Sequence, residues 1–350
     1  MWSQIPKVDY LKILEDHWKL HLAGRGSDAP TVISTFAGCG GSSLGYSMAG
    51  FRELLAVEWD DNAVATFKLN FPGIPVYHGD IAKLSVDDIL KRTGLKPGEL
   101  DILDGSPPCQ GFSTAGKRCM DDDRNQLFKE YVRLLRGLQP KVFVMENVSG
   151  MVKGKMKLIF VEILKELKAS GYEVSARLLN AMYFNVPQSR QRMIFIGVRK
   201  DINIKPSHPN AKVKPLTLRD AIHDLPKDQD ESIDHVWIDE WKINTKWIKK
   251  VPYIKPGNSL RPDGHQIRLE WDKPSPTLIR NGGVQCYVAN SNIHPSEHRT
   301  LSIREMARIA SFPDSYKFID ARKNGHNRIG NCVPPLFMYA IAKHIRKNLL

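Results

Sequence analysis

The stretch TVISTFAGCGGSSLG, residues 31–45, decides the fold, because a short apolar run leads directly into a glycine-rich turn. The run over 31–36 has the length and the β-branched residues of a buried strand. Comparable runs occur at 54–59, 101–104, 142–146 and 193–198. Between them, apolar residues recur at helical spacing over 125–138 and 156–168. This alternation predicts an α/β fold with a parallel sheet covered on both faces.

The alternation stops near residue 200. Residues 201 to about 300 are rich in proline and tryptophan and carry mixed charge, which predicts a second, smaller and irregular domain. A capping box formed by Ser302 and Glu305 then predicts a new helix. A last helix over 335–347 is expected to pack back on the sheet. We therefore predict one domain from residues 1–200, completed by 301–350, and a second from 201–300.

Composition narrows the class of protein. The chain has 350 residues and a formal net charge of +13, of which residues 1–200 carry +5, residues 201–300 carry +2 and residues 301–350 carry +6. A basic balance favours polyanions such as nucleic acid, although many basic proteins bind none. No run of some 18 apolar residues occurs, so we expect neither a membrane span nor a secretory signal. The five scattered cysteines, with no CxxC pair, predict reduced thiols in the cytoplasm and no metal site.

The glycine-rich turn at 38–41 has two readings, a cofactor loop or a plain tight turn. Glu58, at the end of the second run, is suited to holding ribose hydroxyls, and Asp80 could address an adenine amino group. Either acid could equally be a solvated strand end. The spacing is not GxGxxG and no Walker lysine follows, so a nucleoside without a pyrophosphate, such as S-adenosylmethionine, fits better than a dinucleotide.

Cys109 lies in GSPPCQGFS, residues 105–113, directly after the predicted strand 101–104. Taken alone, a free cysteine is usually a small buried hydrophobe. The carboxyl ends of strands in open α/β sheets bind ligands, however, and Glu146 ends another predicted strand. A thiolate can add to an electron-poor ring carbon, while a carboxyl group protonates the ring nitrogen that gains charge. Together they would turn carbon 5 of a pyrimidine into a nucleophile.

Two arginines precede the last predicted strand, in the sequence Gln188-Ser189-Arg190-Gln191-Arg192. In an extended segment, Arg190 and Arg192 share one face and Gln191 points to the other. Two guanidinium groups could converge on a carboxylate or a ring carbonyl. The alternative is a plain basic surface strand.

Taken in order, these motifs resemble those of the DNA (cytosine-5) methyltransferases. The resemblance covers about 31–200 and 274–345. It rests on Phe36-x-Gly38-x-Gly40-Gly41, Glu58, Gly79-Asp80-Ile81, Pro107-Pro108-Cys109-Gln110, Asp123-Arg124-Asn125-Gln126-Leu127, Glu146-Asn147-Val148, Gln188-x-Arg190-x-Arg192, Arg304-x-x-x-Arg308 with Phe312-Pro313, and Gly330-Asn331-x-Val333-Pro334. It departs from the family at Ala310, where a glutamine is common. Residues 1–30 have no counterpart, and 227–273 match nothing informative.

The resemblance implies a Rossmann-like sheet and a role for each site residue. Cys109 would attack carbon 6 of a flipped cytosine, Glu146 would contact ring nitrogen 3, Arg192 would hold the ring carbonyl, and Arg190 would brace the Cys109 loop and Glu146. S-adenosylmethionine would be bound by Phe36, Gly38, Cys39, Gly40, Gly41, Glu58, Trp59, Asp80, Ile81, Pro108, Asn331 and Val333. Contacts to DNA would come from Gln110, Ser113, Thr277, Leu278 and Arg280. Residues 201–300 would be the target-recognition domain.

The resemblance also implies a monomer that acts on double-stranded DNA in the cytoplasm, with a cognate restriction endonuclease acting separately. A tRNA cytosine-5 methyltransferase of the same fold is the alternative. That branch carries a Cys-Phe-Thr element before its last helices, which is missing here. A catalytically silent DNA-binding scaffold would not need Cys109, Glu146 and both arginines. The absence of GxGxxG argues against a nicotinamide oxidoreductase.

Overall fold

The computed structural model describes residues 9–108, 123–152, 154, 156–211, 213–237, 250–260, 266–279 and 292–350. The chain divides into two compact units, which we describe separately. The sheet unit contains Ala23–Asn180, Gln191–Ala211 and Phe337–Leu350. The loop unit contains Met1–Leu22, Ala181–Arg190 and Lys212–Leu336. That residues 201–300 recognise the target remains a prediction.

The sheet unit is built around seven strands in the order β3-β2-β1-β4-β5-β8-β6. Their bounds are β1 (Thr31–Thr35), β2 (Arg52–Glu58), β3 (Val76–His78), β4 (Ile102–Gly105), β5 (Val142–Val148), β6 (Tyr172–Asn180) and β8 (Gln191–Arg199). The helices are α2 (Gly41–Met48), α3 (Asp61–Asn70), α4 (Val86–Thr93), α5 (Asp123–Leu138), α6 (Met156–Ala169) and α11 (Pro335–Asn348), the last from Phe337 onward. The mixed α/β fold predicted from the sequence is confirmed.

The expected all-parallel sheet is wrong at one side. The five strands from β3 to β5 are parallel, but β8 runs antiparallel to both β5 and β6. The reason is the connection from β6 to β8, in which residues 181–190 contain only the short helix η4 (Ala181–Tyr183) and the strand β7 (Gln188–Ser189). A parallel pair needs a crossover of a dozen or more residues, usually a helix, whereas an antiparallel pair can be joined more directly.

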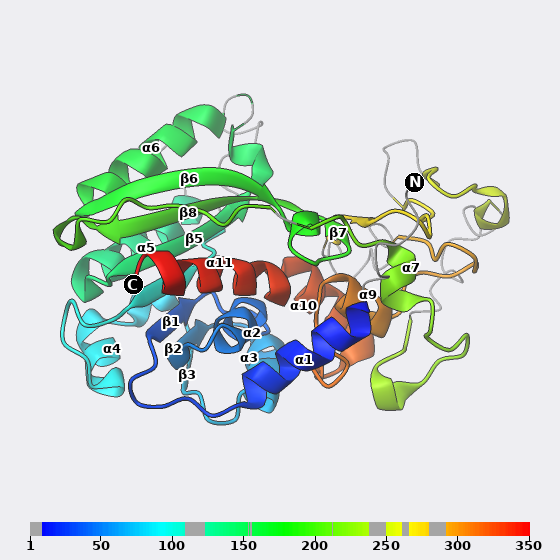
Figure 1. Cartoon of the computed structure of the whole chain (residues 1–350), viewed down its shortest axis with the longest axis horizontal. Coiled ribbons are helices and arrows are strands. Elements are labelled where there is room, and N and C mark those ends of the chain that lie inside the picture. Colours follow the sequence, from blue (N-terminus) through cyan, green and yellow to red (C-terminus); the bar gives the residue numbers. More distant parts are fainter. Residues whose placement is uncertain are drawn as a thin grey trace, which may run out of the picture. The chain divides into compact units, whose positions relative to one another are not determined.

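The two faces of this sheet differ in chemistry. One face forms the main hydrophobic cluster, in which Leu103 of β4 and Phe143 of β5 pack against α4, α5 and α6. Successive residues of a strand point to opposite faces, so Asp104 belongs to the other face. There the Tyr46 hydroxyl of α2 donates a hydrogen bond to Asp104. Figure 1 shows α11 passing in front of the sheet, and Arg346 of α11 donates to the carbonyl of Ala49 beside α2.

The loop unit has little regular structure among its described residues. Its helices are α1 (Tyr10–Leu22), α7 (Leu218–Ile222), α9 (Ile303–Ile309) and α10 (His326–Asn331), and its one described sheet pairs β7 with β9 (Ser275–Pro276). The predicted capping box at the start of α9 is confirmed. The helix α1, which the sequence left unassigned, packs through Tyr10, whose buried hydroxyl donates to the carbonyl of Arg308. Residues 9–22 are therefore an integral part of this unit.

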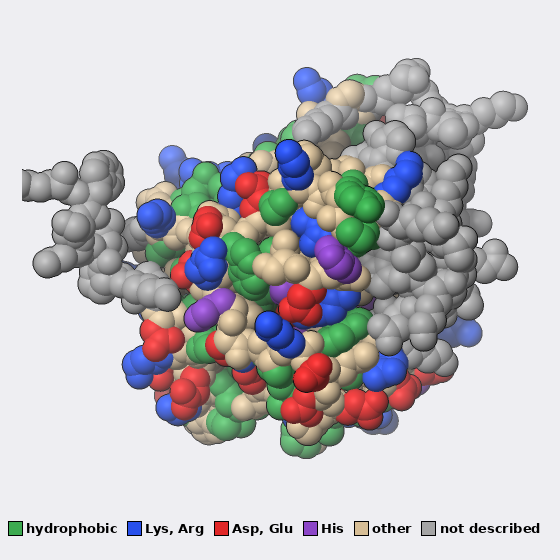
Figure 2. Space-filling model, turned by 90° about the vertical axis from the view of Figure 1, so that its right-hand side faces the viewer, with side chains coloured by type: hydrophobic (Ala, Val, Ile, Leu, Met, Phe, Trp, Pro, Cys, Tyr) green, Lys and Arg blue, Asp and Glu red, His purple; other side chains and the backbone are tan. Residues whose placement is uncertain are grey.

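The described surface shows no simple charge pattern on the face drawn in Figure 2. Basic, acidic and hydrophobic side chains are interspersed there among the residues that the figure colours. The net charge of +13 therefore does not by itself locate a surface for a polyanion on this view. In the part of the chain that the structure describes, no helix combines the length and the apolar character needed to span a membrane.

Candidate active site

Most of the predicted site residues lie at one edge of the sheet. In parallel strands the carboxyl ends meet at the same edge, which is where open α/β sheets bind ligands. The register pairs Thr35 with Val57 on one side and with Gly105 on the other, and Gly105 with Met145. Phe36, Glu58, the segment after Gly105, and Glu146 therefore meet at this edge. The structure brings together what the sequence placed at the ends of separate strands.

The glycine-rich turn has a backbone that few other residues adopt. Gly38 and Gly40 have φ angles of 56° and 91°, in the left-handed region that glycine tolerates without strain. Gly40 directly precedes α2, whose first turn has no side-chain cap. A Cβ built on Gly38 would meet no heavy atom within 4 Å, so its φ angle and not crowding requires glycine there. The turn thus leaves open space beside the amino end of α2, a suitable place for a carboxylate.

Glu58 is part of this turn rather than a solvated strand end. Its Oε2 accepts a hydrogen bond from the backbone N–H of Gly38 at 2.7 Å. Its Oε1 accepts from the N–H groups of Trp59 and Asp60 at 2.8 and 3.0 Å. Only 9% of Glu58 is exposed. One carboxylate therefore joins the end of β2 to the turn that follows β1.

Beside Glu58 lie an aromatic surface and an apolar one. Trp59 is 77% exposed, which is unusual for so large a side chain, and its ring is available for stacking. Asp80 is exposed and accepts from the N–H of Ala82, capping the short helix η1 (Ile81–Lys83). Ile81 is buried, and so is Cys39 in the turn. The carboxylate of Glu58, the indole of Trp59 and the apolar side chain of Ile81 together fit a nucleoside.

The predicted nucleophile lies outside the described residues, together with Gln110 and Ser113. The segment that leads to Cys109 is held firmly. A Cβ on Gly105 would lie 2.4 Å from Thr35 Oγ1 and 2.7 Å from the Tyr131 ring, so only glycine fits this position. The buried Asn147 donates to the carbonyl of Pro107 at 3.1 Å. Pro108 is exposed at the end of this segment.

Glu146 and Arg192 form a close ion pair. Arg192 lies opposite Val148 in the β5–β8 register, so it is the diagonal neighbour of Glu146 on the same face. Its Nε lies 2.6 Å from Glu146 Oε1, and the two side chains are only 13% and 12% exposed. The pair stands at the carboxyl end of β5, two strands from β1.

Arg190 differs from the expectation of one alternating strand. The segment is split, because β7 pairs with β9 whereas β8 pairs with β5 and β6, and Arg190 falls between β7 and β8. Its buried guanidinium donates to the carbonyl oxygens of Leu278 and Gly330 at 2.9 and 3.2 Å. Arg190 and Arg192 are therefore not two residues of one strand, because the chain leaves β7 before Arg190 and enters β8 after it.

The remaining predicted residues belong to the loop unit. Thr277 donates its hydroxyl to the carbonyl of Ser189, and the N–H of the buried Leu278 donates to Gln188 Oε1. Both thus make contacts within the protein, while Arg280 lies outside the described residues. Asn331, at the end of α10, is exposed and Val333 is buried.

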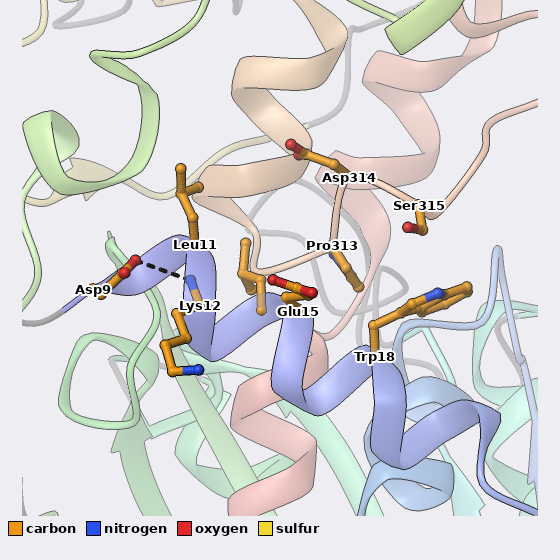
Figure 3. A pocket seen from close by; sticks show the side chains of 9 residues that line it. Asp9, Leu11, Lys12, Glu15, Trp18, Pro313, Asp314 and Ser315 are labelled. Carbon is orange, nitrogen blue, oxygen red and sulfur yellow. Dashed lines mark hydrogen bonds between the residues drawn. The ribbon is translucent and has the colours of Figure 1, made fainter.

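A pocket of about 480 Å³ lies in the loop unit between α1 and residues 313–315. Figure 3 shows Glu15 and Trp18 of α1 on one side and Pro313, Asp314 and Ser315 on the other. None of the predicted site residues lines it. We therefore locate the site by strand ends and hydrogen bonds, not by this pocket.

Sequence reasoning missed two contacts of this edge. Asn147 was noticed only as part of a motif, although its amide anchors the Cys109 segment. Asp104 was included only as the last residue of the run 101–104, and Tyr46 was given no role. A carboxyl group inside a buried strand was the available indication, because such groups are rarely buried without a partner.

Residues 30–347 of the chain match the family model of the C-5 cytosine-specific DNA methylases. The chain belongs to this family. Among curated proteins, the methylase is 35% identical over 336 residues to the type II methyltransferase M1.HphI of Haemophilus parahaemolyticus, covering 91% of this chain and 87% of that one. It is also 35% identical over 339 residues to M.NgoPII of Neisseria gonorrhoeae, covering 91% and 96%.

A solved structure agrees with the fold of the methylase. A putative DNA modification methyltransferase encoded within a prophage (E. coli) superposes with a TM-score of 0.75 at 27% identity, covering 92% of this chain and 99% of that one. The protein is therefore a DNA cytosine-5 methyltransferase that uses S-adenosylmethionine. The turn, the Glu58 carboxylate and the exposed indole of Trp59 fit this cofactor.

Proposed function

We propose that the enzyme methylates carbon 5 of a cytosine flipped out of double-stranded DNA, by way of a covalent bond from Cys109 to carbon 6. One observation carries this proposal. The Glu146–Arg192 pair and the anchored segment before Cys109 lie at the carboxyl ends of adjacent strands, β5 and β4. In this proposal the acid and the cation of that pair act on one ring together with the thiol that follows Pro108.

The chemistry follows from these groups. The Cys109 thiolate adds to carbon 6. The electron pair that this displaces is stabilised when Glu146, which must first take up a proton, delivers that proton to ring nitrogen 3. Arg192 donates to the ring carbonyl and keeps Glu146 in place. S-adenosylmethionine, when bound, supplies the electrophilic methyl group that carbon 5 takes up. The proton on carbon 5 then leaves to water and the bond to Cys109 breaks, while the proton on ring nitrogen 3 returns to Glu146. These losses restore the thiolate, the protonated Glu146 and the aromatic ring.

For the cofactor we propose roles that match the local geometry. Glu58 holds the ribose hydroxyls, Trp59 stacks on the adenine, and Asp80 receives its amino group. The turn at 38–41 and the start of α2 receive the methionine carboxylate. Phe36, Cys39, Ile81, Pro108, Asn331 and Val333 complete the binding residues in this proposal.

For DNA we propose that residues 201–300 read the target sequence. Their share of the net charge is only +2, so attraction to phosphates would come mostly from lysines and arginines elsewhere. Gln110, Ser113, Thr277, Leu278 and Arg280 are the proposed contacts. The similarity to type II methyltransferases supports a role in restriction and modification. A monomeric state, a cytoplasmic location and a separate endonuclease are further parts of this proposal.

The test is a duplex with 5-fluorocytosine at the target position. Fluorine cannot leave carbon 5 as a cation, so the wild type should form a stable covalent complex with this DNA in the presence of cofactor. Cys109→Ser should form none and should turn over below a tenth of the wild-type rate, because a hydroxyl is a far weaker nucleophile near neutral pH. Plasmid DNA and tRNA with labelled cofactor identify the substrate. Methylation of tRNA alone, or an active serine variant, would overturn the proposal.

Two further variants separate the proposed roles. Glu146→Gln cannot deliver a proton and should lose about 10² to 10⁴ in rate, the usual contribution of a general acid. Glu58→Ala should mainly raise the dissociation constant of the cofactor. Equal kinetic profiles for the two variants would contradict the division into a catalytic and a cofactor carboxylate.

Recognition is tested by a chimera. Residues 227–290 are replaced by the matching stretch of a relative that methylates a different site. The chimera should acquire the relative's site, and methylation should be mapped on plasmid DNA. An active chimera that kept the original site would show that other residues determine specificity.

A further inference from the structure

A carboxyl group lies buried directly behind the candidate active site, and the mechanism above does not use it. Asp104 is only 4% exposed, in the strand that leads to Cys109 five residues later. Its Oδ1 accepts a hydrogen bond from the hydroxyl of Tyr46 at 3.1 Å. Tyr46 is completely buried in α2, the helix that begins at the glycine-rich turn.

The strand β4 and the helix α2 therefore meet at Asp104, through the hydroxyl of Tyr46 and also that of Ser42. At one end of this connection, β4 continues through Gly105 to the segment anchored by Asn147. At the other end, α2 begins beside Gly38, which Glu58 holds through its backbone N–H. The Tyr46–Asp104 bond is thus a short path from the proposed cofactor turn to the proposed nucleophile segment.

We propose that Tyr46 and Asp104 form a positioning link, which fixes the strand leading to Cys109 relative to the helix that begins at the cofactor turn. This inference rests on the proposed role of Cys109. The two residues would touch neither cofactor nor cytosine. They would act by setting the distance between the segment that carries Cys109 and the turn that binds the cofactor. A misplacement of reacting groups by about 1 Å can cost a factor of about 10² in rate.

The surroundings of Asp104 keep it neutral. Burial raises its pKa to about 8, and the nearby carboxyl of Glu53 acts in the same direction, although hydrogen bonds with Tyr46 and Ser42 oppose the change. Glu146 also raises the pKa of Asp104 slightly. Burial likewise raises the pKa of Glu53, on β2, to about 7 and that of Tyr131, on α5, well above its usual value.

A neutral Asp104 can accept from Tyr46 without placing a second negative charge near Glu53 and Glu146. Burial also raises the pKa of Tyr46, so its hydroxyl remains a donor over the working pH range. Above about pH 8 the carboxyl ionises inside the fold. The hydroxyl groups of α2 stabilise this charge, but burial and the neighbouring Glu53 and Glu146 disfavour it by more, so ionisation weakens the packing around Asp104 as a whole. The link should therefore loosen in mild alkali.

The test uses three conservative variants of the full enzyme. Tyr46→Phe removes only the Tyr46 hydroxyl and leaves the hydrogen bond of Ser42 to Asp104. Asp104→Asn keeps the acceptor and the shape of the neutral acid but cannot ionise. Tyr172→Phe is the matched control, because it removes another buried tyrosine hydroxyl, which donates to the carbonyl of Pro140 at 2.8 Å. Thermal unfolding of each variant shows that it is folded before kinetics are measured.

Two quantities are measured between about pH 6 and pH 9.5: the rate of covalent complex formation on the 5-fluorocytosine duplex at saturating cofactor, and the cofactor dissociation constant. Tyr46→Phe should slow complex formation about tenfold, the equivalent of one hydrogen bond, with a smaller change in cofactor affinity. Asp104→Asn should keep most of the rate at pH 7 and should lack the decline that the wild type shows above about pH 8. Tyr172→Phe should follow the wild type.

The measurements distinguish a failure of the proposed function from a failure of the Tyr46–Asp104 link. If the wild type forms no covalent complex, the proposed function fails. If it does, and Tyr46→Phe matches Tyr172→Phe in rate, there is no link. If Asp104→Asn retains the alkaline decline, Asp104 is not the group that titrates, and the link in its neutral form is overturned. Should Tyr46→Phe fail to fold, the pH profile of Asp104→Asn still decides.

Discussion

The two compact units are held together by different means. In the sheet unit, backbone groups pair along the strand ladders and Leu103, Phe143 and their neighbours pack into one apolar cluster. In the loop unit, buried arginines do much of this work among the described residues. Arg304 is completely buried and donates to the carbonyl oxygens of Ile233, Pro313 and Tyr316. Buried carbonyl groups need donors. The described part of the loop unit has only the short β7–β9 ladder, so a guanidinium with five N–H groups supplies donors elsewhere in it.

Arg268 repeats the arrangement. Its guanidinium donates to the carbonyl oxygens of Val251, His294 and Glu297. It thereby connects the segment around Val251 with the segment 294–297, and the structure describes no strand pairing between these two. The lesson is that a region of irregular backbone can still be specifically folded. Its stability should then depend on single polar side chains, whereas that of the sheet unit is spread over many apolar contacts.

The largest effect should follow from Arg304→Met. Methionine roughly keeps the apolar stem but removes every hydrogen bond of the guanidinium. The carbonyl of Pro313 still accepts from the N–H of Tyr316 and Asp234 from that of Phe318, but both lose the arginine, as do the carbonyl groups of Ile233 and Tyr316, so we expect a loss of about 3–5 kcal/mol in unfolding free energy. Denaturant unfolding followed by tryptophan fluorescence measures it. Arg322→Met is the control, because this arginine is exposed and pairs with an exposed Glu231. Similar losses for both variants would contradict the role of buried guanidinium groups.

A somewhat smaller effect should follow from Leu103→Ala in the sheet unit. The side chain is fully buried in the main cluster, and such truncations cost about 2–5 kcal/mol depending on how far the cavity collapses. Leu158→Ala, at an exposed position of α6, is the control. A negligible loss at Leu103 would show that the apolar cluster is not what stabilises this unit.

The third prediction concerns how the unfolding free energy depends on pH through a buried acid of the sheet unit. Asp104 of the sheet unit ionises above about pH 4 when unfolded but keeps its proton to about pH 8 when folded, so the wild type loses stability as pH rises between these values. Asp104→Asn removes this loss. Its advantage over the wild type should grow by roughly 3 kcal/mol between about pH 5 and pH 7, measured by denaturant unfolding. An advantage that does not change with pH would contradict a buried neutral acid.

The smallest effect concerns Asp314 in the loop unit, whose pKa is shifted down, whereas that of Asp104 is shifted up. Burial raises the pKa of Asp314, but the bidentate hydrogen bonds from Arg308 outweigh it and leave the pKa below its usual value. The pair therefore stabilises the fold above the unfolded pKa and this contribution disappears as pH falls through the folded one. Asp314 is about half exposed, so Asp314→Asn should cost about 1 kcal/mol at pH 7 and little at pH 3. A cost that is equal at both values would show that the charge is not involved.

Most of the elements could be predicted because their patterns are local. The strands at 31–36 and 142–146, the last helix and the capping box at Ser302 correspond to observed elements within about two residues. The strand β6 was missed, because its alternating polar residues resemble neither the short apolar runs of the core strands nor a helix. The antiparallel direction of β8 was missed for the same reason, since β6 is its partner.

The sequence by itself determined the chemistry: which strands end in a turn of glycines, a thiol segment, a carboxylate or an arginine, and in what order. These are properties of short stretches, and the family match agrees with them. Only the tertiary structure decided which of these groups meet. Glu146 reached Arg192 through an antiparallel register, Arg190 turned to Leu278 and Gly330 where the chain changes sheets, and Asp104 met Tyr46 across 58 residues. Such partners depend on strand register and helix packing. Both arise from the whole chain and cannot be predicted from any single stretch of it.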